Sequence, residues 1–405
     1  MASKSTHISL AEARVHAAIL AIIGWGVLIV FVVAVPGVHS RFGTLKWTDF
    51  VHFYTLGDAA MRGDGAVLYD ANALHGRQMG LVPASASERY LPVYAPQTAL
   101  LFAPLARLPY VAAGAAWAGV IVGVYLLSVY LAWLRSRPYL PDFRTVALLA
   151  VAAPPLVQLV GHGQTTPVVL VAFAGGWRAC ESGRPLLAGL ALSLLAIKPQ
   201  FGLVLAVVAV ATGQWVMIAG GLLGAAAQAA ATSWVLGGDV WRAYGAMLRS
   251  LPAQSALLEP DPSKMHSLSA LTNLLPDALA QPLWLLCCTA VVLATVGIWW
   301  HETSWRIRFG MLVLASALVN PHLTIYDVAV VALPTLWIGG WLAERRLETK
   351  RYWQLVYWLV VSVLLPTAAL VKLQLSPMLM LAIFLEVRAA AQQPGVLRGA
   401  GGATA

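Results

Sequence analysis

The sequence predicts an all-α polytopic membrane protein, a single domain over residues 1–405 with about 12 (10–13) transmembrane helices. Three observations support this fold class. The chain is 60% hydrophobic and only 11% charged, with a mean hydropathy of +0.75, whereas a soluble domain carries about 25% charged residues. Apolar stretches recur along the whole chain, and nearly all the basic residues of its short connecting loops lie in alternate loops.

The apolar stretches set the expected helices, because a bilayer core of about 30 Å takes roughly 20 helical residues. The first stretch is too long for an ordinary signal peptide and lacks an A-x-A cleavage site, so it is expected to stay as a span. The expected segments, several of them short for a full crossing, are 15–35, 110–134, 145–160, 165–177, 186–197, 201–212, 215–236, 278–300, 309–319, 323–342, 352–371 and 377–388.

The loop charges predict the orientation. Loops 135–144, 178–185, 301–308 and 343–351 hold eleven Lys and Arg residues, and the alternate connections hold two. The positive-inside rule therefore places these loops and the N-terminus in the cytoplasm. The alternation requires a helix break at Lys198-Pro199. Two long loops, 36–109 and 237–277, are then extracytoplasmic and are expected to contain short helices.

Composition also argues against several classes of function. The net charge of +9 fits basic cytoplasmic loops, so no nucleic-acid partner is expected. The three cysteines form no CxxC pair and accompany no histidine cluster, so neither a metal site nor a disulfide framework is predicted. The sequence has no phosphate-binding loop or dinucleotide fingerprint, and no cofactor is expected.

The phrase "KWTDFVHFY" (residues 46–54) carries the first carboxylate after the first span, Asp49. A carboxylate beside Trp47, Phe50 and Tyr54 at a membrane surface is suited to act as a general base. The alternative is structural: Asp49 caps a helix that begins at Phe50 or Val51, while Trp47 and Tyr54 anchor the loop at the interface. The residues alone leave both interpretations open.

Three further phrases place polar side chains on the same predicted face. Lys198 in "AIKPQ" is either a phosphate-binding cation or a lysine that extends to the membrane surface. In "NPHLTIYD", His322 and Asp327 are five residues apart and would point about 140° apart on one helix. The helix is therefore expected to begin after His322, with Asp327 deeper, although a purely structural polar cluster is the alternative. Gln164 in "GHGQ" offers an amide to a substrate hydroxyl.

Taken together, several phrases resemble a known family. They are "DFVHFYTLGDAAMRGDGAVLYD", "YAPQTALLFAPLARLP", "GHGQTTPVVLVAFAGGW", "LLAIKPQ", "HSLSAL" and "NPHLTIYDVAVVALP", within residues 45 to 340. In this order they resemble glycosyltransferase family 87 of the GT-C class of membrane glycosyltransferases, which includes mycobacterial phosphatidylinositol-mannoside mannosyltransferases. The family often has Tyr-Pro-Pro where this chain has Tyr94-Ala95-Pro96.

The resemblance implies an inverting transfer of a hexose, with mannose first, from a polyprenyl phosphate sugar to a lipid or glycan acceptor. The reaction would take place on the extracytoplasmic face of the plasma membrane, among membrane lipids, without nucleotide or metal. Asp49 would be the catalytic base. The substrate-binding residues would be Lys198 and Gln200 at the phosphate, His322 and Asp327 at the sugar or phosphate, and Gln164, Tyr94, Tyr54 and His266 elsewhere in the site.

A membrane transporter or flippase is the main alternative, with Lys198 and Asp327 coupling substrate movement. The sequence shows no inverted repeat between its halves, and its polar residues favour one face rather than the midplane. A non-catalytic scaffold is the third interpretation, and tolerance of Asp49 to replacement would favour it.

Overall fold

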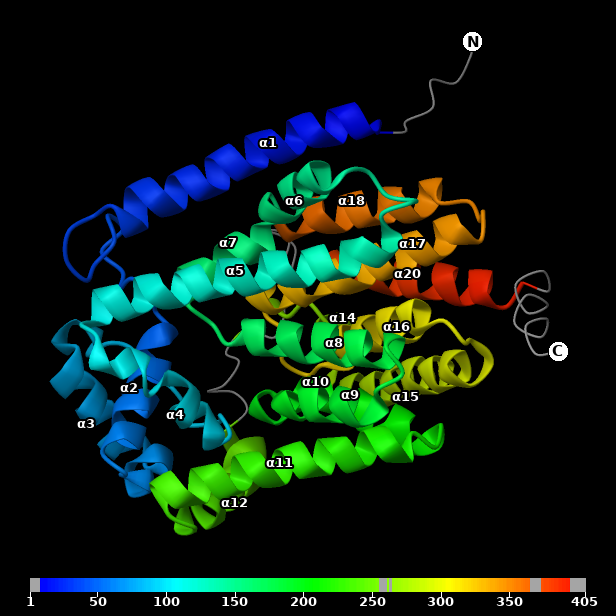
Figure 1. Cartoon of the computed structure of the whole chain (residues 1–405). Helices are drawn as coiled ribbons and strands as arrows, with labels where there is room; N and C mark the ends of the chain where they lie inside the picture. The colour runs from blue at the N-terminus through cyan, green and yellow to red at the C-terminus, as the bar shows by residue number, and fades with distance from the viewer. Residues whose placement is uncertain (1–7, 255–260, 262–263, 365–372, 394–405) are drawn as a thin grey trace.

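The computed structural model describes residues 8–254, 261, 264–364 and 373–393. Across these residues the regular structure is helical, apart from one isolated bridge between His39 and Leu45. Most of the helices run roughly side by side in one elongated bundle (Figure 1). The predicted all-α class is confirmed.

Five helical segments are long and apolar enough to cross a membrane, judged by length and composition within the described residues. They are Leu10–Val33 (α1, Leu10–Val27, with its π-helical continuation), Tyr110–Ser136 (α5), Trp215–Leu236 (α11), Ala278–His301 (within α15, Asp277–His301) and Ile325–Glu344 (η8, Ile325–Val331, with α17, Ala332–Glu344). A sixth span results if α6 (Phe143–Val151) and α7 (Pro154–His162), which meet at 57°, count as one. The polytopic prediction is confirmed, whereas the count of 12 stays a prediction.

Shorter helices account for the other expected segments. They are α8 (Thr166–Glu181), α9 (Pro185–Leu192) with η5 (Ser193–Ile197), α10 (Pro199–Ala211), α16 (Trp305–Val319), α18 (Lys350–Leu364) and α20 (Ser376–Ala391). The predicted break at Lys198-Pro199 is confirmed, because η5 ends at Ile197 and α10 starts at Pro199. The end of the expected segment 352–371 lies outside the described residues.

The helices of the first long loop and α12 (Asp239–Ser250) of the second lie at one end of the molecule, on the left of Figure 1, and α14 (Leu268–Thr272) lies nearer the middle of the view. The first loop supplies α2 (Phe50–Met61), α3 (Ala71–Leu81) and α4 (Gln97–Phe102), with short 3₁₀ turns between them. The second loop supplies α12 (Asp239–Ser250), the turn η6 (Leu251–Gln254) and α14 (Leu268–Thr272). The expected short helices are therefore present, and the ends of the long helices meet them.

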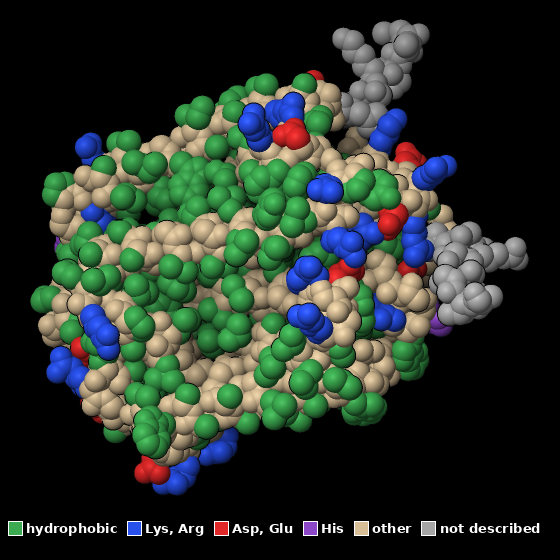
Figure 2. All heavy atoms as spheres, in the orientation of Figure 1, with side chains coloured by type: hydrophobic (Ala, Val, Ile, Leu, Met, Phe, Trp, Pro, Cys, Tyr) green, Lys and Arg blue, Asp and Glu red, His purple; other side chains and the backbone are tan. Residues whose placement is uncertain are grey.

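Ion pairs join the expected cytoplasmic loops at the opposite end. Five pairs link residues far apart in the sequence: Arg14–Asp142, Arg135–Glu181, Arg306–Glu344, Arg345–Glu302 and Arg351–Glu386. On the face shown in Figure 2, hydrophobic side chains cover the long sides, and most Lys and Arg side chains gather toward the right-hand end. The charges thus concentrate where the sequence places the basic loops.

The helices next to the site pack closely through small residues. A Cβ atom on Gly189 of α9 would lie 1.9 Å from the carbonyl oxygen of Met217, and one on Gly220 of α11 would lie 2.1 Å from that of Leu186. Glycine thus lets the α9 and α11 backbones approach closely, as is common between membrane helices. The close contact between α9 and α11 fixes the position of the α9–η5 segment, which ends just before Lys198.

Candidate active site

A cavity of about 380 Å³ lies between the two long loops and the ends of the bundle helices. Its volume falls within the range of about 300–1,000 Å³ that is usual for small-molecule sites. Its lining includes six of the residues expected to act together: Asp49, Gln164, Lys198, Gln200, His322 and Asp327. Tyr94 lines it as well, so most of the predicted site residues meet in one place.

The backbone before α2 is held in an unusual conformation. Trp47 adopts a φ of +49°, which non-glycine residues rarely do. The Tyr110 hydroxyl donates to the carbonyls of Lys46 and Trp47, at 2.5 and 3.0 Å, and the Tyr90 hydroxyl donates to that of Thr48 at 2.6 Å. These tyrosines come from α5 and from the extended stretch before α4. They fix the turn from which Asp49 projects.

The structural interpretation of residues 46–54, with Asp49 as a helix cap and with Trp47 and Tyr54 as anchors at the membrane interface, is wrong in two respects. Helix α2 begins at Phe50 as that alternative expected, but the Asp49 side chain makes no capping hydrogen bond. Trp47 and Tyr54 are not interfacial anchors, since they are only 2% and 7% exposed and belong to the core. The first loop builds its own aromatic core, in which Phe50, Phe53 and Phe102 pack together.

The Asp49 carboxylate instead contacts Gln164. The Gln164 side-chain nitrogen donates to Oδ2 of Asp49 at 2.7 Å. The other oxygen, Oδ1, lies 3.5 Å from the Thr48 hydroxyl, a long contact. Asp49 is therefore half-buried in the cavity wall and held mainly through one oxygen.

The turn "GHGQ" brings Gln164 to Asp49. Gly163 has a φ of +71°, and a Cβ atom there would lie 2.6 Å from Cβ of Phe50, so the turn needs glycine for both conformation and space. The Trp117 ring nitrogen donates to the carbonyls of Gly163 and Gln164, at 3.0 and 3.2 Å. This turn thus packs directly on the start of α2.

Lys198 and Asp327 form a buried ion pair in the cavity wall. Lys198 Nζ lies 2.6 Å from Asp327 Oδ1, and the two side chains are 4% and 2% exposed. Thr166 at the start of α8 donates to the same oxygen at 2.5 Å. Both residues stand at helix starts, Lys198 before α10 and Asp327 in η8. The charge on Lys198 is therefore already offset by a carboxylate.

His322 precedes its helix, as predicted. It lies in the turn before η8, where its backbone N–H donates to Asn320 Oδ1 at 2.9 Å, and Asp327 is the more buried of the two. Burial lowers the pKa of His322, and the neighbouring Lys198 lowers it further, although Asp327 and Asp49 oppose the shift. A neutral imidazole at neutral pH therefore faces the cavity.

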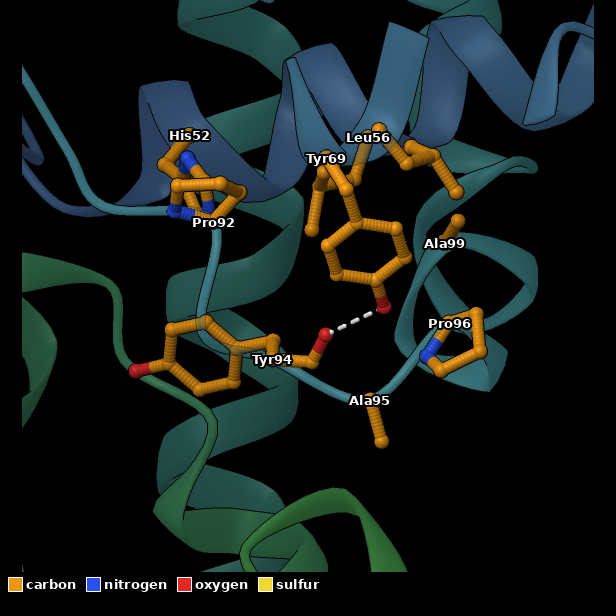
Figure 3. Close-up of a pocket in the computed structure, with 9 residues that line it drawn as sticks. His52, Leu56, Tyr69, Pro92, Tyr94, Ala95, Pro96 and Ala99 are labelled. Carbon is orange, nitrogen blue, oxygen red and sulfur yellow. Dashed lines mark hydrogen bonds between the residues drawn. The ribbon is translucent and has the colours of Figure 1, made fainter. Parts of the chain in front are cut away.

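Tyr94 links the cavity to the first loop. Its hydroxyl donates to the Gln164 side-chain oxygen at 3.1 Å, and burial raises its pKa, so the hydroxyl stays protonated. Its own carbonyl accepts from the Tyr69 hydroxyl at 2.8 Å on the opposite side, as Figure 3 shows. The small pocket in that view also contains His52, whose buried Nε2 has no hydrogen-bond partner among the described residues.

Two predicted substrate-binding residues lie outside this lining. The Tyr54 hydroxyl donates to the Leu108 carbonyl at 2.8 Å, and His266 pairs with the Ser376 hydroxyl at 2.7 Å. Both side chains are buried in contacts within the protein. Their assignment to substrate stays a prediction without support from this geometry.

Sequence reasoning missed several residues that line the cavity. They are Arg89, Tyr90, Tyr244, Leu248, Leu251 and Tyr326. In the sequence Arg89 resembles any exposed loop arginine, and Tyr326 lies within an apolar run. Neither position therefore has a sequence pattern that indicates a binding site. Within the described residues, no group of three or more His, Cys, Asp or Glu side chains is placed to hold a metal ion.

Comparison with known proteins identifies the family. The model of glycosyltransferase family 87 matches residues 93–324, which is more than half of the chain. The match includes Tyr94, Gln164, Lys198 and His322, and it leaves Asp49 and Asp327 outside. Comparisons with curated proteins and with solved structures gave no match. The chain belongs to glycosyltransferase family 87 and is a multi-pass membrane glycosyltransferase.

Proposed function

We propose that the protein transfers a hexose, with mannose first, from a polyprenyl phosphate sugar to a hydroxyl of a lipid or glycan acceptor. The reaction takes place on the extracytoplasmic face of the plasma membrane. The observation that carries this proposal is the placement of Asp49, held through one carboxylate oxygen, in the wall of a cavity that Arg89 also lines.

Asp49 is the general base of the proposed reaction. It takes the proton from the acceptor hydroxyl while that oxygen attacks the anomeric carbon. The bond from this carbon to the phosphate oxygen breaks on the opposite side, so the anomeric configuration inverts. Polyprenyl phosphate leaves with the bonding electrons, and Asp49 later releases its proton to water. A base positioned in this way contributes about 10²- to 10⁴-fold to the rate.

Arg89 is our main candidate for the cation that meets the leaving phosphate. It lines the cavity, is exposed, and makes no hydrogen bond or ion pair with another residue that the structure describes. Lys198, which the sequence suggested for this role, already neutralises Asp327. A guanidinium also presents a planar fork of donors that suits phosphate oxygens.

The apolar side of the cavity supports a lipid-linked donor. Leu248 and Leu251 come from the α12–η6 segment, and Ile197 comes from the end of η5. Helix α12 is amphipathic, with Val240 and Met247 buried and with exposed arginines on its other face. Such a helix suits the membrane surface, where a prenyl chain would pass from the lipid into the site.

The test uses the purified protein in nanodiscs with a panel of synthetic polyprenyl phosphate sugars and a lipid extract as acceptor. We expect a new glycolipid by mass spectrometry, without any nucleotide sugar and in the presence of EDTA, and an inverted anomeric centre by NMR. Product formation from GDP- or UDP-sugars alone would contradict the lipid-linked donor. Transport of an unchanged substrate across sealed vesicles, without any transfer, would contradict the proposed reaction.

A further inference from the structure

The Gln164 side chain has four polar contacts, all with this protein. Its Nε2 donates to Asp49 Oδ2 at 2.7 Å and to the Tyr326 hydroxyl at 3.1 Å. Its Oε1 accepts from the Tyr94 hydroxyl at 3.1 Å and from the Thr165 backbone N–H at 3.2 Å. Gln164 is 4% exposed, and three of the four partners, Asp49, Tyr94 and Tyr326, come from other segments of the chain.

These contacts fix the orientation of the amide. A backbone N–H can only donate, and an ionised carboxylate can only accept. If the amide were turned over, its NH₂ would face the Thr165 N–H and its oxygen would face the Asp49 carboxylate. Both contacts would then be repulsive, and the Thr165 N–H and the Asp49 carboxylate would lose their hydrogen-bond partner. The Nε2 atom must therefore point at Asp49.

The same contacts use every hydrogen-bond donor and acceptor of the Gln164 side chain, so none remains for a substrate. A glutamine amide has two N–H donors and two acceptor lone pairs, and protein groups occupy all four. A sugar hydroxyl would have to displace one of them. The side chain expected from the sequence to hold a substrate hydroxyl is thus already fully bonded.

We propose that Gln164 is a positioning residue that selects which oxygen of Asp49 acts as the base. It holds Oδ2, so Oδ1 is left to accept the proton of the acceptor hydroxyl. The Tyr94 hydroxyl and the Thr165 N–H donate to the amide oxygen of Gln164, and the amide nitrogen donates to the Asp49 carboxylate. This inference rests on the proposed function, because it assigns a task to Asp49 as the base.

The first test compares Gln164→Met with the wild-type enzyme in the glycosyl-transfer assay. The methionine matches the length of glutamine but cannot donate to Asp49. We expect kcat to fall by on the order of 10²-fold, the usual effect of a catalytic group that loses its alignment, with the donor KM within twofold. A raised donor KM with unchanged kcat would instead show that Gln164 binds substrate, and wild-type values for both would overturn the inference.

Gln164→Glu gives a sharper readout, because its effect depends on pH. When protonated, the introduced glutamate can donate to Asp49 Oδ2 as the amide does. When both carboxylates are ionised at this distance, they repel each other and Asp49 turns away. We expect the activity of the variant relative to wild type to be highest near pH 5.5 and to fall by pH 8. A constant ratio across this range would contradict the inference.

The other titratable groups of the site are common to both enzymes, so the ratio of their pH profiles removes them. These groups are Asp327, Lys198, Arg89, Tyr90, Tyr94, Tyr110, Tyr244, Tyr326, His52, His162 and His322. A purely structural role for Gln164 would lower activity equally at each pH.

A measurement without substrate separates this inference from the proposed function. At pH 8, Gln164→Glu should lower the thermal unfolding temperature. The double variant with Asp49→Asn should recover it, because the introduced asparagine amide can donate to the introduced glutamate. Failure to recover would show that the two side chains do not interact as described. If instead Asp49→Asn alone keeps full transferase activity, the proposed general base is wrong while the contact stands.

Discussion

At the scale of single residues, Asp49 differs from the other aspartates of the first loop in the contacts that its carboxylate makes. Asp58 and Asp64 are paired with Arg77, and Asp70 caps α3 by accepting from two backbone N–H groups. The contacts of these three acids stabilise the fold of the loop. Asp49 has its strong hydrogen bond at one oxygen only, from an uncharged amide, which leaves a carboxylate oxygen for a reaction.

The turn at Gly163 gives the first prediction. Gly163→Ala places a Cβ atom against Phe50 and forces a non-glycine residue into the left-handed region, at a cost of about 1–2 kcal/mol. We expect a lower unfolding temperature and a turnover reduced on the order of 10²-fold, because Gln164 and Asp49 move apart. Kinetics and thermal unfolding of the purified variant measure both effects.

Gly161 provides the matched control for this substitution. It belongs to the same motif but lies within α7, and a Cβ atom there meets only Leu28 at 3.6 Å, an ordinary contact. Gly161→Ala should keep wild-type turnover. Equal damage from both substitutions would show that the motif is merely sensitive to size.

Arg89 gives a second prediction at this scale. Arg89→Ala should raise the KM for the polyprenyl phosphate sugar about tenfold or more, because a charge-assisted contact to phosphate is worth about 1.5–3 kcal/mol. Arg89→Lys should restore part of the affinity. Arg107→Ala is the control, since Arg107 is exposed in the same loop and does not line the cavity. A donor KM unchanged in Arg89→Ala would remove this residue from the phosphate site.

At the scale of elements, the Lys198–Asp327 pair ties three helix starts together. Thr166 begins α8, Lys198 precedes α10, and Asp327 lies in the first turn of η8. Leaving one member of a buried ion pair alone typically costs about 3–5 kcal/mol. We therefore expect Lys198→Met and Asp327→Leu each to lower the unfolding temperature of the detergent-solubilised protein strongly.

The double variant tests whether the effect belongs to the pair. Apolar residues of similar volume in both positions should recover most of the lost stability. Additive losses in the double variant would show that the two residues act separately. An unchanged unfolding temperature in Lys198→Met alone would contradict the buried pair.

At the scale of the whole molecule, the buried histidines make the fold sensitive to acid. Burial lowers the pKa of His52 and of His266 to about 4, from an ordinary value of 6.5. Below pH 6.5 the unfolded chain gains a proton at each position, whereas the folded chain does so only near pH 4. The contribution of these two histidines to the free energy of unfolding is therefore fully present above pH 6.5 and is lost on acidification toward pH 4, by up to about 1.4 kcal/mol per pH unit for each histidine.

Thermal unfolding between pH 7.5 and pH 4.5 measures this dependence. His52→Gln should reduce the slope of the unfolding temperature against pH, even if it lowers the overall stability, because one titrating group is lost. An unfolding temperature that does not change over this range would contradict the burial of neutral histidines.

The sequence alone predicted the helices and the break at Lys198-Pro199 because apolar length and proline act locally. It could not pair the side chains, since Asp49 meets Gln164 across 115 positions and Lys198 meets Asp327 across 129. Packing between distant segments also explains why the interpretation of Trp47 and Tyr54 as anchors at the membrane interface is wrong. Aromatic residues after a span suggest a membrane interface, but here the loop folds into a core of its own and buries them.

The central claim is that Asp49 is the base for sugar transfer from a polyprenyl phosphate donor. The most direct test is single-turnover transfer from that donor by Asp49→Asn, with Asp70→Asn as the control. In the first variant the asparagine keeps an oxygen for the Gln164 hydrogen bond, and in the second it still caps α3, so both variants should fold. We predict a rate reduced by about 10²- to 10⁴-fold in Asp49→Asn and a wild-type rate in Asp70→Asn. A near-normal rate in Asp49→Asn, at equal protein level, would contradict the claim.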